Sequence, residues 1–188
     1  MFNIVLVAPE IPANTGNIGR TCVVTGSRLH LVGPLGFSLD EKSLHRAGLG
    51  YWESLDVVVH ENWEAFLDAA GPTARLHLLT KKARRTYAEA RYADGDYLVF
   101  GCESVGLPEV LLAAHADRCE RIPMLPDATS LRNASTWGTP GSHNTLLAQD
   151  VCGNFVNPED YRISALNLSN AAAIVLYEAL RQTGFKGM

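Results

Sequence analysis

Short apolar runs alternate with segments of helical periodicity along most of this chain. The run at residues 2–8 is apolar and rich in β-branched side chains, and prolines follow it, which is typical of a buried strand that ends in a loop. Residues 14–26 then predict a helix with Asn14 or Thr15 as its cap and Gly26 at its end. A second strand follows at residues 28–32. Strand, helix and strand in about thirty residues form a βαβ unit, which implies a parallel sheet.

The same alternation continues through the middle of the chain. Ser38 and Glu41 form a capping box for a short helix that ends near Gly48. Two further helices are expected, the first capped by Asn62 and the second beginning after Pro108. These helices cover residues 63–70 and 109–114, and strands are expected at 55–59, 75–79 and 97–100, with the end of a last strand at 121–124. The chain is therefore predicted to form a layered α/β domain.

The end of the chain differs from this pattern in two ways. Residues 164–170 form a polar junction that runs directly into an apolar helix at 171–180, and this helix start is either a plain cap or a ligand-binding terminus. Residues 128–163 are rich in Thr, Ser, Asn, Gly and Pro and show no period, so they form either a functional flap or a disordered insert. We therefore expect one domain over residues 1–188, with an inserted loop at 128–163.

Composition limits the partners and the location of this domain. A net charge of -4 gives the molecule as a whole no attraction for polyanions, so a nucleic-acid partner needs a local patch. Four basic residues meet that need within five positions, or else form a solvated loop. They are Lys81, Lys82, Arg84 and Arg85. The four cysteines are too dispersed for a metal site, and with no signal peptide they indicate a reducing cytoplasm. No apolar run is long enough to cross a membrane, so we expect a cytoplasmic protein without a metal.

Three glycine-containing or polar junctions follow predicted strands, at residues 14–20, at 101–107, and at 122 with its delayed partner at 166–170. Ligands of open parallel sheets bind beyond the carboxyl ends of the strands, so these junctions predict one composite pocket. None of them is a dinucleotide fingerprint or a P-loop, which argues against NAD and ATP. The chain also lacks the nucleophile elbow of hydrolases and the zinc-protease motif.

Four segments in order carry a resemblance to a known family. Asn-Thr-Gly-Asn-Ile-Gly-Arg at 14–20, Phe-Gly-x-Glu-x-x-Gly-Leu at 100–107, Ile-Pro-Met at 122–124 and Asn-Leu-Ser-Asn-Ala at 167–171 together resemble the motifs of the SPOUT RNA 2'-O-ribose methyltransferases. The likeness is closest to the branch that acts on cytidine or uridine 34 of tRNA, which also carries Pro-Glu-Ile-Pro as at residues 9–12. It covers nearly the entire chain except the insert.

The resemblance implies an α/β fold whose parallel sheet has helices on both faces, with a C-terminal trefoil knot and an obligate homodimer. It implies S-adenosylmethionine as cofactor, S-adenosylhomocysteine as product and tRNA as substrate, methylated at the 2'-hydroxyl of wobble nucleotide 34. Cofactor contacts are implied for Leu79, Gly101, Glu103, Ile122, Met124, Leu166 and Ser169. Roles in catalysis or substrate placement are implied for Asn14, Arg20, Ser169, Asn170 and Tyr177.

Several roles stay open at this stage. A guanidinium is not readily deprotonated, so Arg20 fits a phosphate clamp better than a general base, while Tyr177 either orients a proton or packs in its helix. The insert separates two motifs that adjoin in the family, so either Ser130 or Ser164 takes the place of the family's cofactor-side serine. The alternatives for function are a related enzyme acting at another tRNA or rRNA site, and a catalytically inactive cofactor-binding protein that interacts with RNA.

Overall fold

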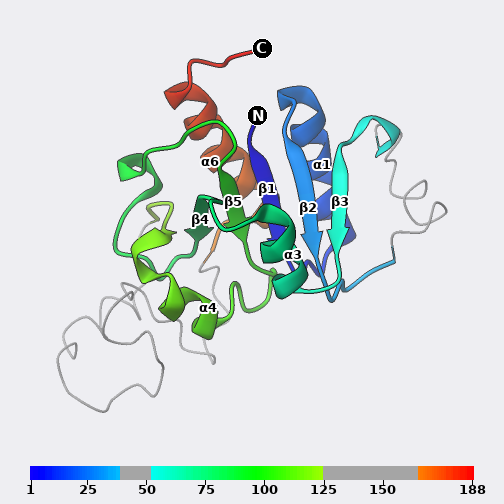
Figure 1. The fold of residues 1–188 in the computed structure, drawn as a ribbon, viewed down its shortest axis with the longest axis horizontal. Helices are drawn as coiled ribbons and strands as arrows, with labels where there is room; N and C mark the ends of the chain where they lie inside the picture. The colour runs from blue at the N-terminus through cyan, green and yellow to red at the C-terminus, as the bar shows by residue number, and fades with distance from the viewer. Residues whose placement is uncertain (39–51, 125–164) are drawn as a thin grey trace.

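The computed structural model describes residues 1–38, 52–124 and 165–188. Within these residues, parallel strands form one sheet in the order β3-β2-β1-β5-β4-β6 (Figure 1). The strands are β1 (Asn3–Val7), β2 (Arg28–Val32), β3 (Val57–His60), β4 (Leu76–Leu79), β5 (Tyr97–Phe100) and β6 (Cys119–Glu120). The first strand therefore lies in the interior of the sheet, between β2 and β5.

Helices cover both faces of the sheet, as predicted (Figure 1). The α-helices are α1 (Pro12–Thr25), α3 (Trp63–Ala70), α4 (Glu109–Ala114) and α6 (Leu168–Gln182), and the short 3-10 helices are η1 (Trp52–Ser54), η2 (Tyr87–Glu89) and η3 (Ala116–Arg118). The alternation of side chains along β1 divides the core: Ile4 and Leu6 pack with α1 and α6, whereas Val5 and Val7 pack with α3 and α4. Two apolar cores thus lie on either side of one sheet.

Several boundaries agree with the sequence-based prediction. The strands at 28–32 and 97–100 and the helices at 63–70 and 109–114 have the predicted limits. Asn62 caps α3, because its side-chain oxygen accepts a hydrogen bond of 2.9 Å from the backbone nitrogen of Ala65. Gly26 ends α1 in the left-handed conformation at φ +63°. Asn167 caps α6 and accepts from the backbone nitrogens of Ser169 and Asn170.

Other boundaries were predicted wrongly. The last helix was expected at 171–180, but α6 begins at Leu168, directly after its cap, and ends at Gln182. Helix α1 begins at Pro12 and not after Asn14 or Thr15, because a proline suits the first turn of a helix and both polar residues are buried within it. The strand predicted at 55–59 is β3 at Val57–His60. Leu55 follows η1 and packs into the core from outside the sheet. The last strand ends at Glu120, and only an isolated bridge from Arg121 to Thr86 continues its pairing.

Other predictions fall outside the described residues. They are the short helix that ends near Gly48, the insert at 128–163 and the candidate serines Ser130 and Ser164. In the part of the chain that the structure describes, no helix has the length and apolarity to span a membrane. The same residues contain no group of three or more His, Cys, Asp or Glu side chains placed to hold a metal ion.

Candidate active site

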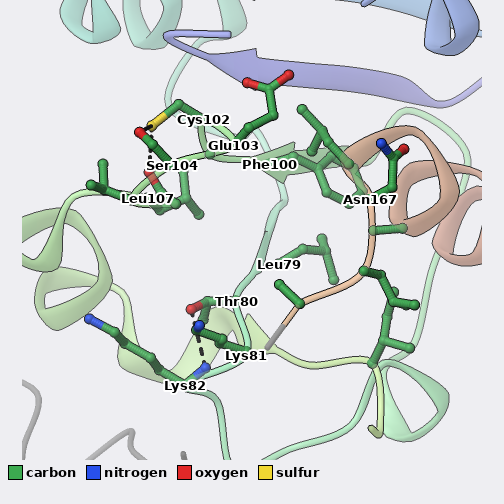
Figure 2. Close-up of a pocket in the computed structure, with 18 of the residues that line it drawn as sticks. Leu79, Thr80, Lys81, Lys82, Phe100, Cys102, Glu103, Ser104, Leu107 and Asn167 are labelled. Carbon is green, nitrogen blue, oxygen red and sulfur yellow. Dashed lines mark hydrogen bonds between the residues drawn. The ribbon is translucent and has the colours of Figure 1, made fainter. Parts of the chain in front are cut away.

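A pocket of about 450 Å³ lies at the carboxyl ends of β4, β5 and β6, where the start of α6 closes it (Figure 2). Segments far apart in the sequence line it. They are residues 79–82 at and after the end of β4, residues 100–107 at and after the end of β5, Leu112 from α4, Glu120, Ile122 and Met124 from β6 onward, residues 165–168 with Ala171, and Ile11 and Asn14 at the start of α1. The composite pocket predicted from the three junctions is thus present, and its volume is in the range of small-molecule sites.

The structure brings together most, but not all, of the predicted site residues. The pocket lining includes Asn14, Leu79, Lys81, Lys82, Gly101, Glu103, Ile122, Met124 and Leu166. The described lining does not include Arg20, Arg84, Arg85, Ser169, Asn170 and Tyr177. Ser169 and Asn170 nevertheless lie in the first turn of α6, directly after lining residue Leu168.

Glu103 joins the loop after β5 to the start of α1. Its carboxylate accepts hydrogen bonds from the backbone nitrogens of Glu10 at 2.9 Å and Ile11 at 3.3 Å, and from Asn14 Nδ2 at 2.9 Å. Glu10 reciprocates, because its carboxylate accepts from the backbone nitrogen and the hydroxyl of Ser104 at 3.0 and 2.7 Å. A carboxylate at a helix N-terminus is favourably placed against the helix dipole. The two glutamates therefore hold one wall of the pocket together.

Asn14 extends this contact to the last helix. Asn167 donates from Nδ2 to Oδ1 of Asn14 at 2.9 Å, while Oδ1 of Asn167 accepts from the hydroxyl of Ser169 at 2.7 Å. Because the amide of Asn14 donates to Glu103 and accepts from Asn167, its orientation is defined by two different partners. A continuous set of hydrogen bonds thus runs from the loop after β5, through α1, to the start of α6.

Gly101 lets two parts of the pocket wall approach closely. A Cβ atom at this position would overlap the backbone of Gly106 and Leu107, so no other residue fits without displacing that loop. The loop returns on itself here, with an isolated bridge between Cys102 and Gly106. The missing side chain of Gly101 therefore lets the returning loop pack directly against the end of β5.

The basic residues predicted to bind RNA follow β4 and lie beside the pocket. Lys82 forms an ion pair of 2.8 Å with Glu109 at the start of α4, and Arg85 forms one of 2.9 Å with Glu120. Lys81 and Lys82 line the pocket, and in Figure 2 they lie across it from the loop that carries Ser104. The four positive residues therefore lie at the carboxyl edge of the sheet, where the pocket is.

Arg20 and Tyr177 lie on the outer surface of the two helices that cover one face of the sheet. Arg20 is exposed on α1, and Tyr177 is 44% exposed on α6. Tyr177 is therefore not a packing tyrosine of the core, whose α6 members include Val175, Leu176 and Ala179.

The described cysteines are free thiols of two kinds. Burial raises the pKa of Cys22 to about 12, and burial with nearby Asp117 and Glu120 raises the pKa of Cys119 to about 11, so neither forms a thiolate near neutral pH. Cys102 is partly exposed in the pocket wall, 3.7 Å from the hydroxyl of Ser104.

Three residues of this region were missed as site residues. Asn167 was available as the first residue of the Asn-Leu-Ser-Asn motif, and Glu10 as the acidic residue between two prolines. Glu120 gave no usable signal, because a glutamate next to Arg121 suggests an exposed position. In the structure it is fully buried at the end of β6 and lines the pocket.

Comparison with known proteins identifies the family that carries this site. Residues 1–137 match the model of the SpoU rRNA methylase family. The chain belongs to this family. The SpoU methylase is 45% identical to the tRNA (cytidine(34)-2'-O)-methyltransferase of Saccharophagus degradans over 100% of this chain and 99% of the relative. It is 43% identical to the Escherichia coli protein of the same name, over 100% of this chain and 97% of that one.

A solved structure agrees with this membership. The structure reported with insights into the 2-OH methylation of C/U34 on tRNA is 36% identical to the SpoU methylase and matches it with a TM-score of 0.74, covering 98% of this chain and 97% of the other. The family predicted from the four motifs is therefore confirmed.

Proposed function

We propose that this SpoU methylase transfers a methyl group from S-adenosylmethionine to the ribose 2'-hydroxyl of nucleotide 34 in tRNA. The observation that carries the proposal is the full-length similarity to relatives named for that reaction, with no large part of either chain left unmatched. The pocket adds a physical argument, since it gathers residues of all four motif segments around one cavity.

The residues that line the pocket fit the proposed cofactor. Leu79, Ile122 and Leu166 supply apolar surface for a flat base, and residues 101–107 line the pocket with a loop whose backbone groups would pair with the edge of a base. We propose that Met124 and Glu103 complete this side, with Ser169 at the nearby helix start. S-adenosylmethionine would supply an activated methyl group, so that the protein mainly has to align the accepting oxygen.

The remaining polar residues fit the substrate side. We propose that Asn14, Asn170 and Ser169 position the ribose, because the hydrogen bonds through Asn14 and Asn167 hold α1 and the start of α6 in a fixed relation. Arg20 would bind a neighbouring phosphate through its planar fork of donors. Tyr177 would orient the departing proton. Lys81, Lys82, Arg84 and Arg85 would contact the RNA backbone beside the pocket.

We also propose the assembly implied by the family resemblance, a homodimer of knotted subunits. Helices α1 and α6 cover the same face of the sheet and carry exposed apolar side chains, with Val24 63%, Ile174 38% and Tyr177 44% exposed. A second copy placed there would bury this surface and bring a second set of basic residues to one RNA. Sedimentation that shows only monomer at micromolar concentration would rule out the dimer.

The insert at 128–163 is proposed to be an active-site flap within the single domain 1–188. Aromatic residues among polar ones suit contact with an unpaired base. Replacing the insert with a short connection should then change RNA affinity more than cofactor affinity. Calorimetry that shows cofactor binding lost and RNA binding unchanged would assign the insert to the cofactor pocket instead.

The function is tested by transfer of a radiolabelled methyl group to bulk tRNA, followed by mapping of 2'-O-methylation in a deletion strain. The proposal predicts incorporation in the assay and loss of the modification at nucleotide 34 in the strain. Loss at another tRNA or rRNA position would indicate the related enzyme. Cofactor binding without any transfer would indicate an inactive RNA-interaction protein.

A further inference from the structure

Glu120 is a fully buried carboxylate with three side-chain partners from different parts of the chain. Its Oε1 lies 2.7 Å from Nδ1 of His77 on β4 and accepts a hydrogen bond of 2.9 Å from Nη2 of Arg85. Its Oε2 accepts a bond of 2.7 Å from the hydroxyl of Tyr92. Buried carboxylates are stable only when such partners satisfy them, so each of these contacts is expected to matter.

The partners of Glu120 are themselves held in place. Nε2 of His77 lies 3.0 Å from Oδ2 of Asp96, which is also buried, so the His77 ring is held between two carboxylates. Burial and the neighbouring carboxylate raise the pKa of Tyr92, which therefore stays a phenol and keeps its donor. Arg75 lies 3.5 Å from Asp96 at the outer side of this group.

The side-chain contacts around Glu120 compensate for the weak backbone pairing of β6. β6 has two residues and two register pairs with β4, at Leu78–Cys119 and Leu79–Glu120. The chain then continues to Ile122 and Met124 in the pocket wall. Two pairs give few backbone hydrogen bonds, so the side-chain contacts of Glu120 have a large share in fixing this edge.

The same carboxylate fixes the basic segment, defined here as Lys81, Lys82, Arg84 and Arg85. Two backbone hydrogen bonds tie the ends of this segment to β6 and the residue after it. The nitrogen of Thr80 donates to the oxygen of Glu120 at 2.8 Å, and the nitrogen of Arg121 donates to the oxygen of Arg85 at 2.9 Å. Glu120 adds a charged side-chain contact between β6 and this segment. The side chain of Arg85 is still 42% exposed, so its guanidinium is anchored at the surface.

We propose that Glu120 is a positioning residue for the RNA substrate, which fixes Arg85 and with it the basic segment at the edge of the pocket. An arginine held by a buried carboxylate presents its planar fork in one orientation and loses less freedom when it binds a phosphate. The inference rests on the proposed function, since the RNA is the partner that the basic segment would meet.

The test compares Glu120→Gln, Arg85→Gln and the double variant in the tRNA methyl-transfer assay. If Glu120 acts through Arg85, each single variant raises KM for tRNA by about tenfold, and the double variant raises it no further. In Arg85→Gln the Kd for S-adenosylmethionine should change by less than about threefold, because Arg85 does not belong to the described pocket lining. Arg85→Lys, which keeps the charge but loses the fork, should restore part of the loss.

A second ion pair in the chain provides a matched control. Arg28 pairs with Asp56 at 2.7 Å, and its side chain is also 42% exposed. Arg28 is the first residue of β2, so this ion pair lies at the amino ends of the strands, whereas the pocket lies at their carboxyl ends. Arg28→Gln and Asp56→Asn change the same charges and should leave KM for tRNA within about twofold of the wild-type value.

Three results would overturn the inference. The first is a KM effect of Glu120→Gln that multiplies with that of Arg85→Gln, and the second is a rise in cofactor Kd in Arg85→Gln as large as its rise in KM for tRNA. The third is an Arg85→Gln variant whose KM for tRNA and salt dependence of tRNA binding are both unchanged. This last measurement decides alone if Glu120→Gln fails to fold, because the loss of Arg85 should lower the salt dependence of tRNA binding by about one counterion. Wild-type protein that methylates no tRNA would refute the proposed function instead.

Discussion

Asn167 and Asn14, which are 153 positions apart in the sequence, are joined by a hydrogen bond of 2.9 Å between their side-chain amides. The bond places the first turn of α6 against the first turns of α1, and Glu103 occupies the other side of Asn14. Three predicted motifs thus meet at one amide group. Because donor and acceptor of that amide have different partners, small chemical changes at Asn14 should have effects that its size alone does not explain.

The variant Asn14→Asp should destabilise the protein and reduce activity. In the wild-type protein Nδ2 of Asn14 donates to Glu103 Oε1 at 2.9 Å, and Asn14 is only 5% exposed. The variant keeps the shape of the side chain but replaces this donor with a carboxylate oxygen, which faces the carboxylate of Glu103. We expect a loss of about 2 kcal/mol or more in the free energy of unfolding, measured by urea denaturation. Asn17→Asp makes the same change at an exposed position of α1 and should have little effect. Equal stability of the two variants would contradict this role of Asn14.

The variant Arg20→Ala should abolish methyl transfer while leaving the fold and cofactor affinity nearly intact. Arg20 is exposed on α1 and does not belong to the described pocket lining, so its loss opens no cavity there. A phosphate clamp acts only on the RNA, and misalignment of the acceptor should lower kcat/KM by about a hundredfold or more. Turnover would be measured on tRNA and cofactor binding by calorimetry. Turnover close to the wild-type value would refute the clamp.

The variant Gly101→Ala should disrupt the pocket wall. Its Cβ would overlap backbone atoms of Gly106 and Leu107, which cannot move aside as a flexible side chain can. We expect a loss of stability of about 1 to 3 kcal/mol together with weaker cofactor binding, measured by thermal unfolding and calorimetry. Cys102→Ala changes the adjacent, partly exposed side chain and should fold normally. A stable Gly101→Ala protein with unchanged cofactor affinity would show that the close approach has no importance for the pocket.

Stability should fall between about pH 6.5 and pH 4 because of a buried histidine pair. Nδ1 of His30 lies 3.0 Å from Nε2 of His60. Burial, together with the nearby His60 and Arg28, lowers the pKa of His30 to about 4, and the opposing effect of Asp56 is smaller. Burial also lowers the pKa of His60. In this interval the unfolded chain binds a proton that the folded protein does not, so the free energy of unfolding decreases as the pH falls, by about 3 kcal/mol for His30.

Urea denaturation at pH 7 and pH 5 measures this dependence. The variant His30→Gln should show a smaller decrease between the two values, because one of the titrating groups is gone. His115→Gln removes a histidine outside the pair and serves as the control. A wild-type protein with equal stability at both pH values would show that the buried pair does not control acid stability.

The central part of the fold could be predicted because its strands are apolar runs that end in Gly, Pro or Asn. Residues 28–32 and 97–100 are such runs, and Asn62 and Gly71 mark the limits of α3 as clearly. β6 could not be predicted, because a strand of two residues has no period and owes its place to side-chain contacts of Glu120. The start of α1 was misplaced because Asn14 and Thr15 have the chemistry of caps, whereas Asn14 uses it for Glu103 and Asn167.

The site shows the same division between local and distant information. Motif residues that line the pocket, such as Gly101 and Leu166, could be predicted from their position after a strand or before a helix. The carboxylate of Glu120 could not, since nothing near it in the sequence indicates that His77 and Tyr92 would surround it. Partners brought together only by the sheet order are not encoded in any local pattern.

The interior position of β1 has a consequence for how the chain folds as it is synthesised. β1 is made first, and β2 can pair with it early, but its other neighbour is β5 at Tyr97–Phe100. Until residues 97–100 have left the ribosome, one side of β1 has no strand to pair with and remains open to wrong partners. Contacts of such sequence separation form slowly, and unpaired apolar strands promote aggregation. The yield of folded protein should therefore depend on how quickly β5 is synthesised after β1.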